Sequence, residues 1–247
     1  MTPAVVAEQV PLRPHIPSRM LDRVFFTTMI LLCWATILYG FSKTYFLAGM
    51  VRAPLPNLLI HVHGAVFTLW MVLLLVQTTL ITTKKIKVHR ALGMYGFGLA
   101  AAMLVLGVLA AVDALKRGEA PQGLDASTFF IVPMSDMLAF CGLVYFAYSM
   151  RSRPELHKRL ILFSTIALID AGVGRWPVDY LQAHPPMQDL VILAFLVAVA
   201  GFDLLQLHRL SKATIWASLW LIVIHGTRVP FGHGGLWHSF ASLCLKT

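Results

Sequence analysis

The sequence predicts an all-α membrane bundle with about seven spanning helices, and three observations support that fold class. Of the 247 residues, 58% are hydrophobic and 13% charged, and the mean hydropathy is +0.75. A soluble domain of this length is normally more polar. The apolar residues form long continuous runs, not the alternating pattern of a membrane β-barrel, and basic residues gather in every second connection.

Seven apolar segments approach the roughly 20 residues that a helix needs to cross about 30 Å of hydrocarbon. They lie at 24–49, 58–83, 91–112, 128–150, 156–175, 188–207 and 213–229. The fifth is the most polar, because Asp170 and Arg175 interrupt its end. Residues 1–22 contain no apolar core, so the first span is predicted to be an uncleaved anchor. We expect a cytoplasmic segment at 1–22, a bundle at 23–230 and an outer tail at 231–247.

The basic residues predict the orientation of the bundle, since Lys and Arg are retained on the cytoplasmic side of short loops. The second connection reads "KKIKVHR", the fourth "RSRPELHKR" and the sixth "HRLSK". These connections and the basic N-terminal segment would share one side, so we expect the N-terminus inside and the C-terminus outside. This pattern also explains the net charge of +9, with anionic lipid headgroups of the bilayer as partners and no nucleic acid.

The stretch "LLIHVHGAVFTLW" places His61 and His63 in the first turns of the second span. At about 100° per residue the two side chains point about 160° apart, so they cannot both ligate one ion from a regular helix. His63 shares a stripe with Trp70 and Gln77, and His61 shares one with Gly64 and other small residues that favour close helix packing. His63 is therefore the better candidate for a buried site.

Ionisable residues inside a membrane are costly and tend to face a site or a partner. His89 and His157 open the third and fifth spans at the predicted inner side. The predicted outer side collects a second set, which is His61, His63, His225, Asp136 and Asp170. Arg175 or Arg228 could neutralise one of these carboxylates, and Lys43 the other. Two layers of histidine would suit two stacked cofactors.

The first functional hypothesis is electron transfer through b-type haem, because imidazoles from facing helices are its usual axial ligands. His89 and His157 form the predicted inner pair. For the outer site, His63 could pair with His225 or with a methionine of the fourth span, Met134 or Met137. A quinone or another redox protein would then be the partner.

Three other hypotheses remain open. His61, His63, Asp136 and Asp170, with His225, supply the ligand types of a zinc or copper site. Asp136, Asp170 and Asp203 could instead carry protons in a transporter, and the apolar helix faces would suffice for a subunit of a larger membrane complex. No nucleophile motif, phosphate-binding loop or zinc-protease signature occurs, so the sequence leaves open whether the protein is an enzyme.

A family resemblance adds to this interpretation. With "TYFLAG", "LPNLLIHVHGAVFTLW", "VQTTL", "HRALG" and "RPELHKRLILFSTIALID", residues 40–175 resemble an uncharacterised family of bacterial multi-pass membrane proteins. The resemblance implies a location in the bacterial inner membrane. The spaced histidines are more distantly similar to cytochrome b561-like bundles, which implies haem ligation by His63, His89 and His157.

Overall fold

The computed structural model describes residues 19–47, 57–121, 123–178, 180–181, 184 and 186–246. Within these residues every regular element is helical, which confirms the predicted all-α class. The elements are α1 (Arg19–Phe41), the π-helix η1 (Ser42–Phe46), α2 (Leu58–Thr82), α3 (Ile86–Lys116), α4 (Ala126–Phe129), α5 (Ile131–Ser149), α6 (Pro154–Val173), α8 (Pro186–Leu207), α9 (Lys212–Gly232) and α10 (Gly235–Lys246).

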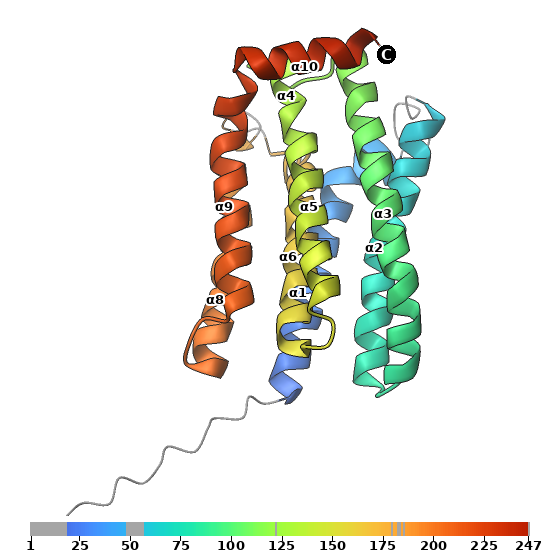
Figure 1. Cartoon of the computed structure of the whole chain (residues 1–247), viewed down its shortest axis with the longest axis vertical. Coiled ribbons are helices and arrows are strands. Elements are labelled where there is room, and N and C mark those ends of the chain that lie inside the picture. Colours follow the sequence, from blue (N-terminus) through green and yellow to red (C-terminus); the bar gives the residue numbers. More distant parts are fainter. Residues whose placement is uncertain are drawn as a thin grey trace, which may run out of the picture.

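The long helices form a bundle, and α10 lies across one end of it. Figure 1 shows α1, α2, α3, α5, α6, α8 and α9 running along the long axis, with α10 at right angles to them. The short helix α4 lies at the same end, which we call the α10 end. The first residues of α1 lie at the opposite end of the bundle (Figure 1). Arg19 and the C-terminal helix are thus separated by the full length of the bundle.

Several of these helices are suited to crossing a bilayer. Five segments are long and apolar enough by length and composition: Arg19–Phe46, Leu58–Thr82, Ile86–Lys116, Ala126–Ser149 and Met187–Leu207. A multi-pass membrane protein therefore agrees with the structure, but the predicted count of seven spans is not reached. The helices that fall short are α6 and α9, because α6 carries Glu155, Lys158, Arg159 and Asp170, and α9 carries Lys212, His225 and Arg228.

The long helix with the highest proportion of charged residues is also the most buried. Helix α6 packs against α1, α5, α8 and α9, and its side chains Phe163, Ile166 and Ile169 are fully buried. Helix α1 crosses α6 where Gly40 meets Gly172, and a Cβ on Gly40 would overlap the Gly172 carbonyl oxygen. Small residues allow this close backbone approach. Two of the charged residues of α6, Arg159 and Asp170, thus lie in the interior of the bundle and not on a lipid-facing surface.

The predicted span boundaries agree with the helices to within a few residues, except at the ends of α3 and in the predicted tail. The predicted span 91–112 is part of a longer helix, Ile86–Lys116, because charged residues near a helix end can reach water. The predicted tail 231–247 is largely helical, since α9 ends at Gly232 and α10 follows. Residues 1–18, and the first span beyond residue 47, lie outside the described residues.

Candidate functional site

Charged residues from α5, α6, α8 and α9 meet in the half of the bundle nearest α10. They are Asp136, Asp170, Asp189, His225 and Arg228, which we call the carboxylate cluster. Arg228 Nη1 lies 3.1 Å from Asp136 Oδ1 and 3.0 Å from Asp170 Oδ2, and its Nη2 lies 3.6 Å from Asp189 Oδ1. One guanidinium therefore holds side chains from all three of the other helices.

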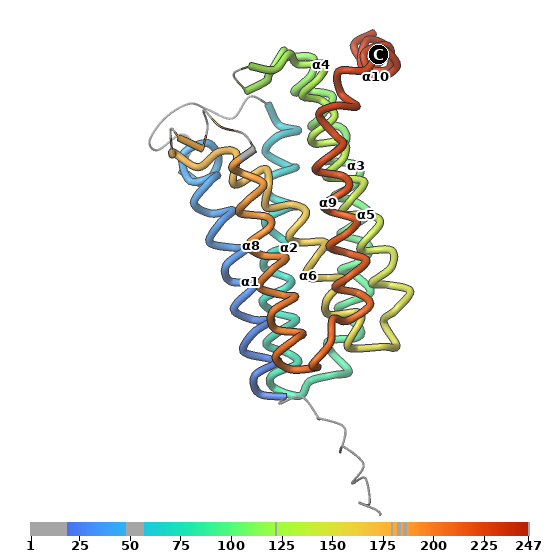
Figure 2. The backbone as a smooth tube through the Cα atoms, turned by 90° about the vertical axis from the view of Figure 1, so that its left-hand side faces the viewer, coloured from blue at the N-terminus to red at the C-terminus, as the bar shows by residue number. Residues whose placement is uncertain are grey.

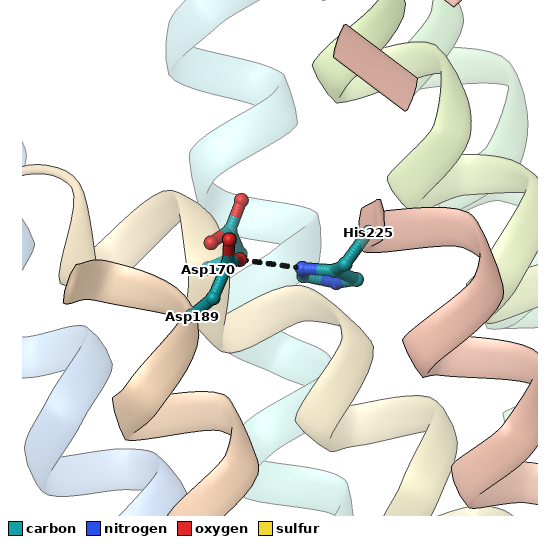
Figure 3. Close-up of side chains that lie close together, drawn as sticks. All are labelled: Asp170, Asp189 and His225. Atoms are coloured by element: carbon teal, nitrogen blue, oxygen red, sulfur yellow. Dashed lines mark hydrogen bonds and ion pairs between the residues drawn. The ribbon is translucent and has the colours of Figure 1, made fainter. Parts of the chain in front are cut away.

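His225 faces the carboxylates from α9. Its Nδ1 lies 3.0 Å from Asp189 Oδ1, the interaction drawn as a dashed line in Figure 3. The His225 side chain is only 8% exposed and that of Asp170 is 7% exposed, whereas that of Asp189 is 47% exposed. The cluster is thus buried on the α6 and α9 side and reaches the surface at Asp189.

Two buried atoms of the cluster have no hydrogen-bond partner, namely Asp170 Oδ1 and His225 Nε2. A carboxylate oxygen accepts but does not donate, and if His225 Nδ1 donates its proton to Asp189, then Nε2 carries a lone pair. Unsatisfied buried acceptors are rare because they cost free energy. Asp170, Asp189 and His225 each offer a ligand atom, and these three atoms lie within 4.8 Å of one another.

The charges of the cluster do not balance. When ionised, the carboxylates of Asp136, Asp170 and Asp189 carry three negative charges against one positive charge on Arg228. The Asp189 side chain is 47% exposed to water, and Arg175 also interacts electrostatically with Asp170, so less negative charge is left unbalanced in the buried part of the cluster. A buried carboxylate can lose such a charge by binding a proton or by contacting an added cation, so the cluster is compatible with cation binding.

A second buried ion pair lies near the opposite end of the bundle and differs from the cluster in being fully satisfied. Arg159 of α6 donates from Nε, at 2.9 Å, and from Nη2 to Asp203 Oδ1 of α8. The other oxygen, Asp203 Oδ2, accepts from the backbone N–H of Ser211 at 2.9 Å and from the Thr214 hydroxyl. No acceptor of Asp203 is left for a ligand, so we assign this pair to stability.

The predicted outer metal ligands separate into two groups. Asp136 and Asp170 lie in the carboxylate cluster. His61 is exposed on α2, where its carbonyl oxygen accepts from the Tyr45 hydroxyl at 3.2 Å. His63 is half-buried and stacks on Phe67, with 4.1 Å between ring centroids. The contacts that the structure gives for these two histidines do not include a member of the cluster.

The predicted haem ligands show the same division. His225 belongs to the carboxylate cluster, and His63 remains apart from it on α2. At the opposite end of the bundle, His89 of α3 and His157 of α6 lie close enough to interact electrostatically. His157 Nδ1 is hydrogen-bonded to the Ala147 carbonyl oxygen at 2.9 Å, which leaves Nε2 free of that bond. The two histidines predicted as an inner pair thus lie in the same region of the fold.

The neutralising role predicted for Lys43 is wrong. Arg228 contacts both Asp136 and Asp170, and Lys43 is exposed on η1. Sequence reasoning also missed Asp189, which resembles an ordinary acidic residue in the first turn of a helix. A signal was available, because antiparallel spans at 188–207 and 213–229 place Asp189 and His225 at similar depth.

No protein-family model, curated protein or solved structure matches this chain.

Proposed function

We propose that this protein is a multi-pass membrane protein that binds a divalent transition-metal cation, with Zn²⁺ as the best fit, through Asp170, Asp189 and His225. The observation that carries the proposal is that Asp170, Asp189 and His225 each hold a ligand atom within 4.8 Å of the others, while the buried Asp170 Oδ1 has no hydrogen-bond partner. Asp170 Oδ1 would gain an electrostatic partner when a cation binds, and His225 would coordinate the cation through Nδ1 in exchange for its hydrogen bond to Asp189.

The donor set favours a transition metal over Ca²⁺ or Mg²⁺. Imidazole suits Zn²⁺ and its neighbours in the periodic table, whereas Ca²⁺ and Mg²⁺ prefer oxygen ligands alone. Asp136 and Arg228 would support the ligands, since Arg228 engages Asp170 Oδ2 and leaves Oδ1 available. The Asp189 side chain, which is 47% exposed, offers the cation a route from the surface.

We further propose that α6 and α9 also cross the membrane, which gives seven spans with the N-terminus inside a bacterial inner membrane. Both helices run beside the five more apolar ones in Figure 1. The charges that lower their hydropathy are paired inside the bundle, as in Arg159–Asp203 and Arg228–Asp170, so they do not have to face lipid. The basic connections support this orientation.

Isothermal titration of Zn²⁺ into the purified protein tests the metal site. Asp170→Asn and His225→Ala each remove one ligand, and His61→Ala is the matched control because His61 is exposed on another helix. Supporting residues alone change metal affinity by roughly 10–100-fold, so each ligand variant should weaken Zn²⁺ binding by at least about tenfold. The proposal fails if the native protein does not bind Zn²⁺, or if both ligand variants bind it as the control does.

Haem binding by His89 and His157 is a second candidate, and it would make the protein an electron carrier with a quinone or redox-protein partner. One observation favours it: haem-ligating histidines commonly bond their second nitrogen to a carbonyl oxygen, as His157 does with Ala147. Haem would supply one-electron chemistry, and the aromatic ring of Phe97, 6.4 Å from that of His157, would line the site.

A visible spectrum of protein produced with adequate iron and haem tests this candidate. We expect a Soret band and a dithionite-induced α band that both His89→Ala and His157→Ala abolish. Folded native protein without a Soret band would exclude haem and leave the metal proposal untouched.

A further inference from the structure

Helix α10 is firmly attached to the end of the bundle. It packs against α3, α4 and α9, and Trp237 Nε1 donates to the Ser127 carbonyl oxygen at 2.8 Å. The Thr128 hydroxyl is hydrogen-bonded to His238 Nε2 at 3.2 Å. Trp237 and Ala241 are buried in a small core of their own that includes Phe130. These contacts fix both the position and the rotation of α10.

With the rotation of α10 fixed, most of its side chains divide into three faces, while Leu245, 47% exposed, and His238 lie on the remaining flank. The first is the buried face with Trp237 and Ala241. The second is an exposed apolar stripe with Leu236, Phe240 and Leu243, which are 86%, 42% and 60% exposed. The third is an exposed polar face with Ser239, Ser242 and Lys246. At about 100° per residue, the apolar stripe lies between the buried face and the polar face.

The arrangement of the three faces of α10 agrees with its position across the end of the bundle. The bundle helices cross the membrane along the long axis, so α10, at right angles to them, runs parallel to the membrane plane (Figure 1). Figure 2 views α10 end-on, at the edge of the end of the bundle. Its buried face meets the bundle, so its polar face is directed away from the membrane and its apolar stripe is directed sideways.

We propose that α10 is an interfacial helix whose stripe of Leu236, Phe240 and Leu243 inserts among the lipids at the boundary between headgroups and acyl chains. Amphipathic helices in this plane bury their apolar side roughly 5–10 Å into that boundary. Phe231 at the end of α9 is also an exposed apolar side chain at this end of the bundle, being 57% exposed with its ring centroid 6.0 Å from that of Trp237. Lys246 lies on the polar face, where it can reach lipid phosphates.

Lipid is a better occupant than a second copy of the chain. The contacts of α10 do not extend its stripe into a groove or a flat apolar face, and an adjoining serine and lysine face would be desolvated against a protein partner. Lipid requires no complementary surface, and it leaves the serines and Lys246 in water. This inference does not depend on the metal site.

Spin-label accessibility in lipid nanodiscs that hold one copy of the full chain tests the proposal. Nitroxides are attached through Leu243→Cys or Ser239→Cys in a variant with Cys33, Cys141 and Cys244 replaced by alanine. Collision rates are measured with oxygen, which concentrates in lipid, and with a water-soluble nickel chelate. Val105→Cys in the middle of α3 gives a lipid reference, and Glu119→Cys in a loop gives a water reference.

We expect the ratio of oxygen to nickel collisions to be several-fold higher at residue 243 than at residue 239, and to lie between the values at residues 119 and 105. Equal ratios at 243 and 239, or a ratio at 243 that matches residue 119, would place the stripe in water and overturn the proposal. Protection of residue 243 from both reagents, in these discs or only in discs with two copies, would indicate a protein occupant and also overturn it.

Discussion

Asp203→Asn should destabilise the protein far more than the loss of any ion pair near the surface. Arg159 and Asp203 are 1% and 0% exposed at their side chains, so neither charge is solvated by water. Asparagine keeps an oxygen for Ser211 and Thr214 but removes the negative charge. Arg159 would then retain only Glu155, whose side chain is 60% exposed. Removing one partner of a buried pair typically costs 3–5 kcal/mol, and we expect about 3 kcal/mol because the shape is preserved.

Two variants make this prediction specific. Asp22→Asn breaks the pair between Asp22 and Lys158, which are 2.6 Å apart with side chains 25% and 21% exposed, and it should cost less than about 1 kcal/mol. Arg159→Met combined with Asp203→Asn removes both charges, so most of the stability should return. The interaction free energy between residues 159 and 203 is obtained from the double-mutant cycle of these variants.

The assay is equilibrium unfolding in mixed detergent micelles, followed by helical circular dichroism. If Asp203→Asn costs no more than Asp22→Asn, the buried pair does not carry the stability assigned to it. If the double variant loses the sum of the two single effects, an uncompensated charge is not the cause.

Further predictions concern packing, a buried indole and a helix cap, and the same unfolding assay checks each of them. Gly40→Ala should cost about 1–3 kcal/mol, since its Cβ would overlap the backbone of α6. At Gly201 a Cβ would meet open space, so Gly201→Ala should be neutral or stabilising by up to about 1 kcal/mol. Equal changes in the free energy of unfolding for the two variants would refute the close crossing of α1 and α6. Thr165→Val removes the partner of the Trp70 indole N–H, 3.3 Å away, and should cost about 1–3 kcal/mol. Asn57→Ala removes the cap of α2, a 3.0 Å bond to the Ile60 N–H, and also the 2.8 Å bond from Asn57 Nδ2 to Asp113 Oδ1. It should cost at least about 0.5–2 kcal/mol, and no loss of stability would show that water replaces both bonds.

The spanning helices could be predicted because each depends on a local quantity, the length of an apolar run. The predicted 58–83 and 188–207 correspond to Leu58–Thr82 and Pro186–Leu207. The length of an apolar run is a weaker guide for α6, because its charged residues lower its hydropathy although it is the most buried of the long helices. A hydropathy scale assumes that a helix faces lipid, and α6 instead faces its neighbours.

The candidate site could be predicted in part, because depth follows from position along a span. Asp136, Asp170 and His225 were expected on the outer side of the bundle, and the structure brings them into one cluster. His61 and His63 were expected on the same side but lie apart from the cluster on α2. Their haem or metal ligation stays a prediction, as does ligation by His89 and His157.

The sequence alone determined which segments are helical, how polar each one is and that His61 and His63 point in different directions, since helical rotation is a local property. Only the tertiary structure decided which helices are neighbours and which way each is turned. Those choices made Arg228 the common partner of Asp136 and Asp170, brought Asp189 beside His225, and left two buried ligand atoms without a partner. The physical reason is that the rotation of a helix about its axis is set by packing across the whole bundle, and the sequence of one segment does not specify which helices pack against it.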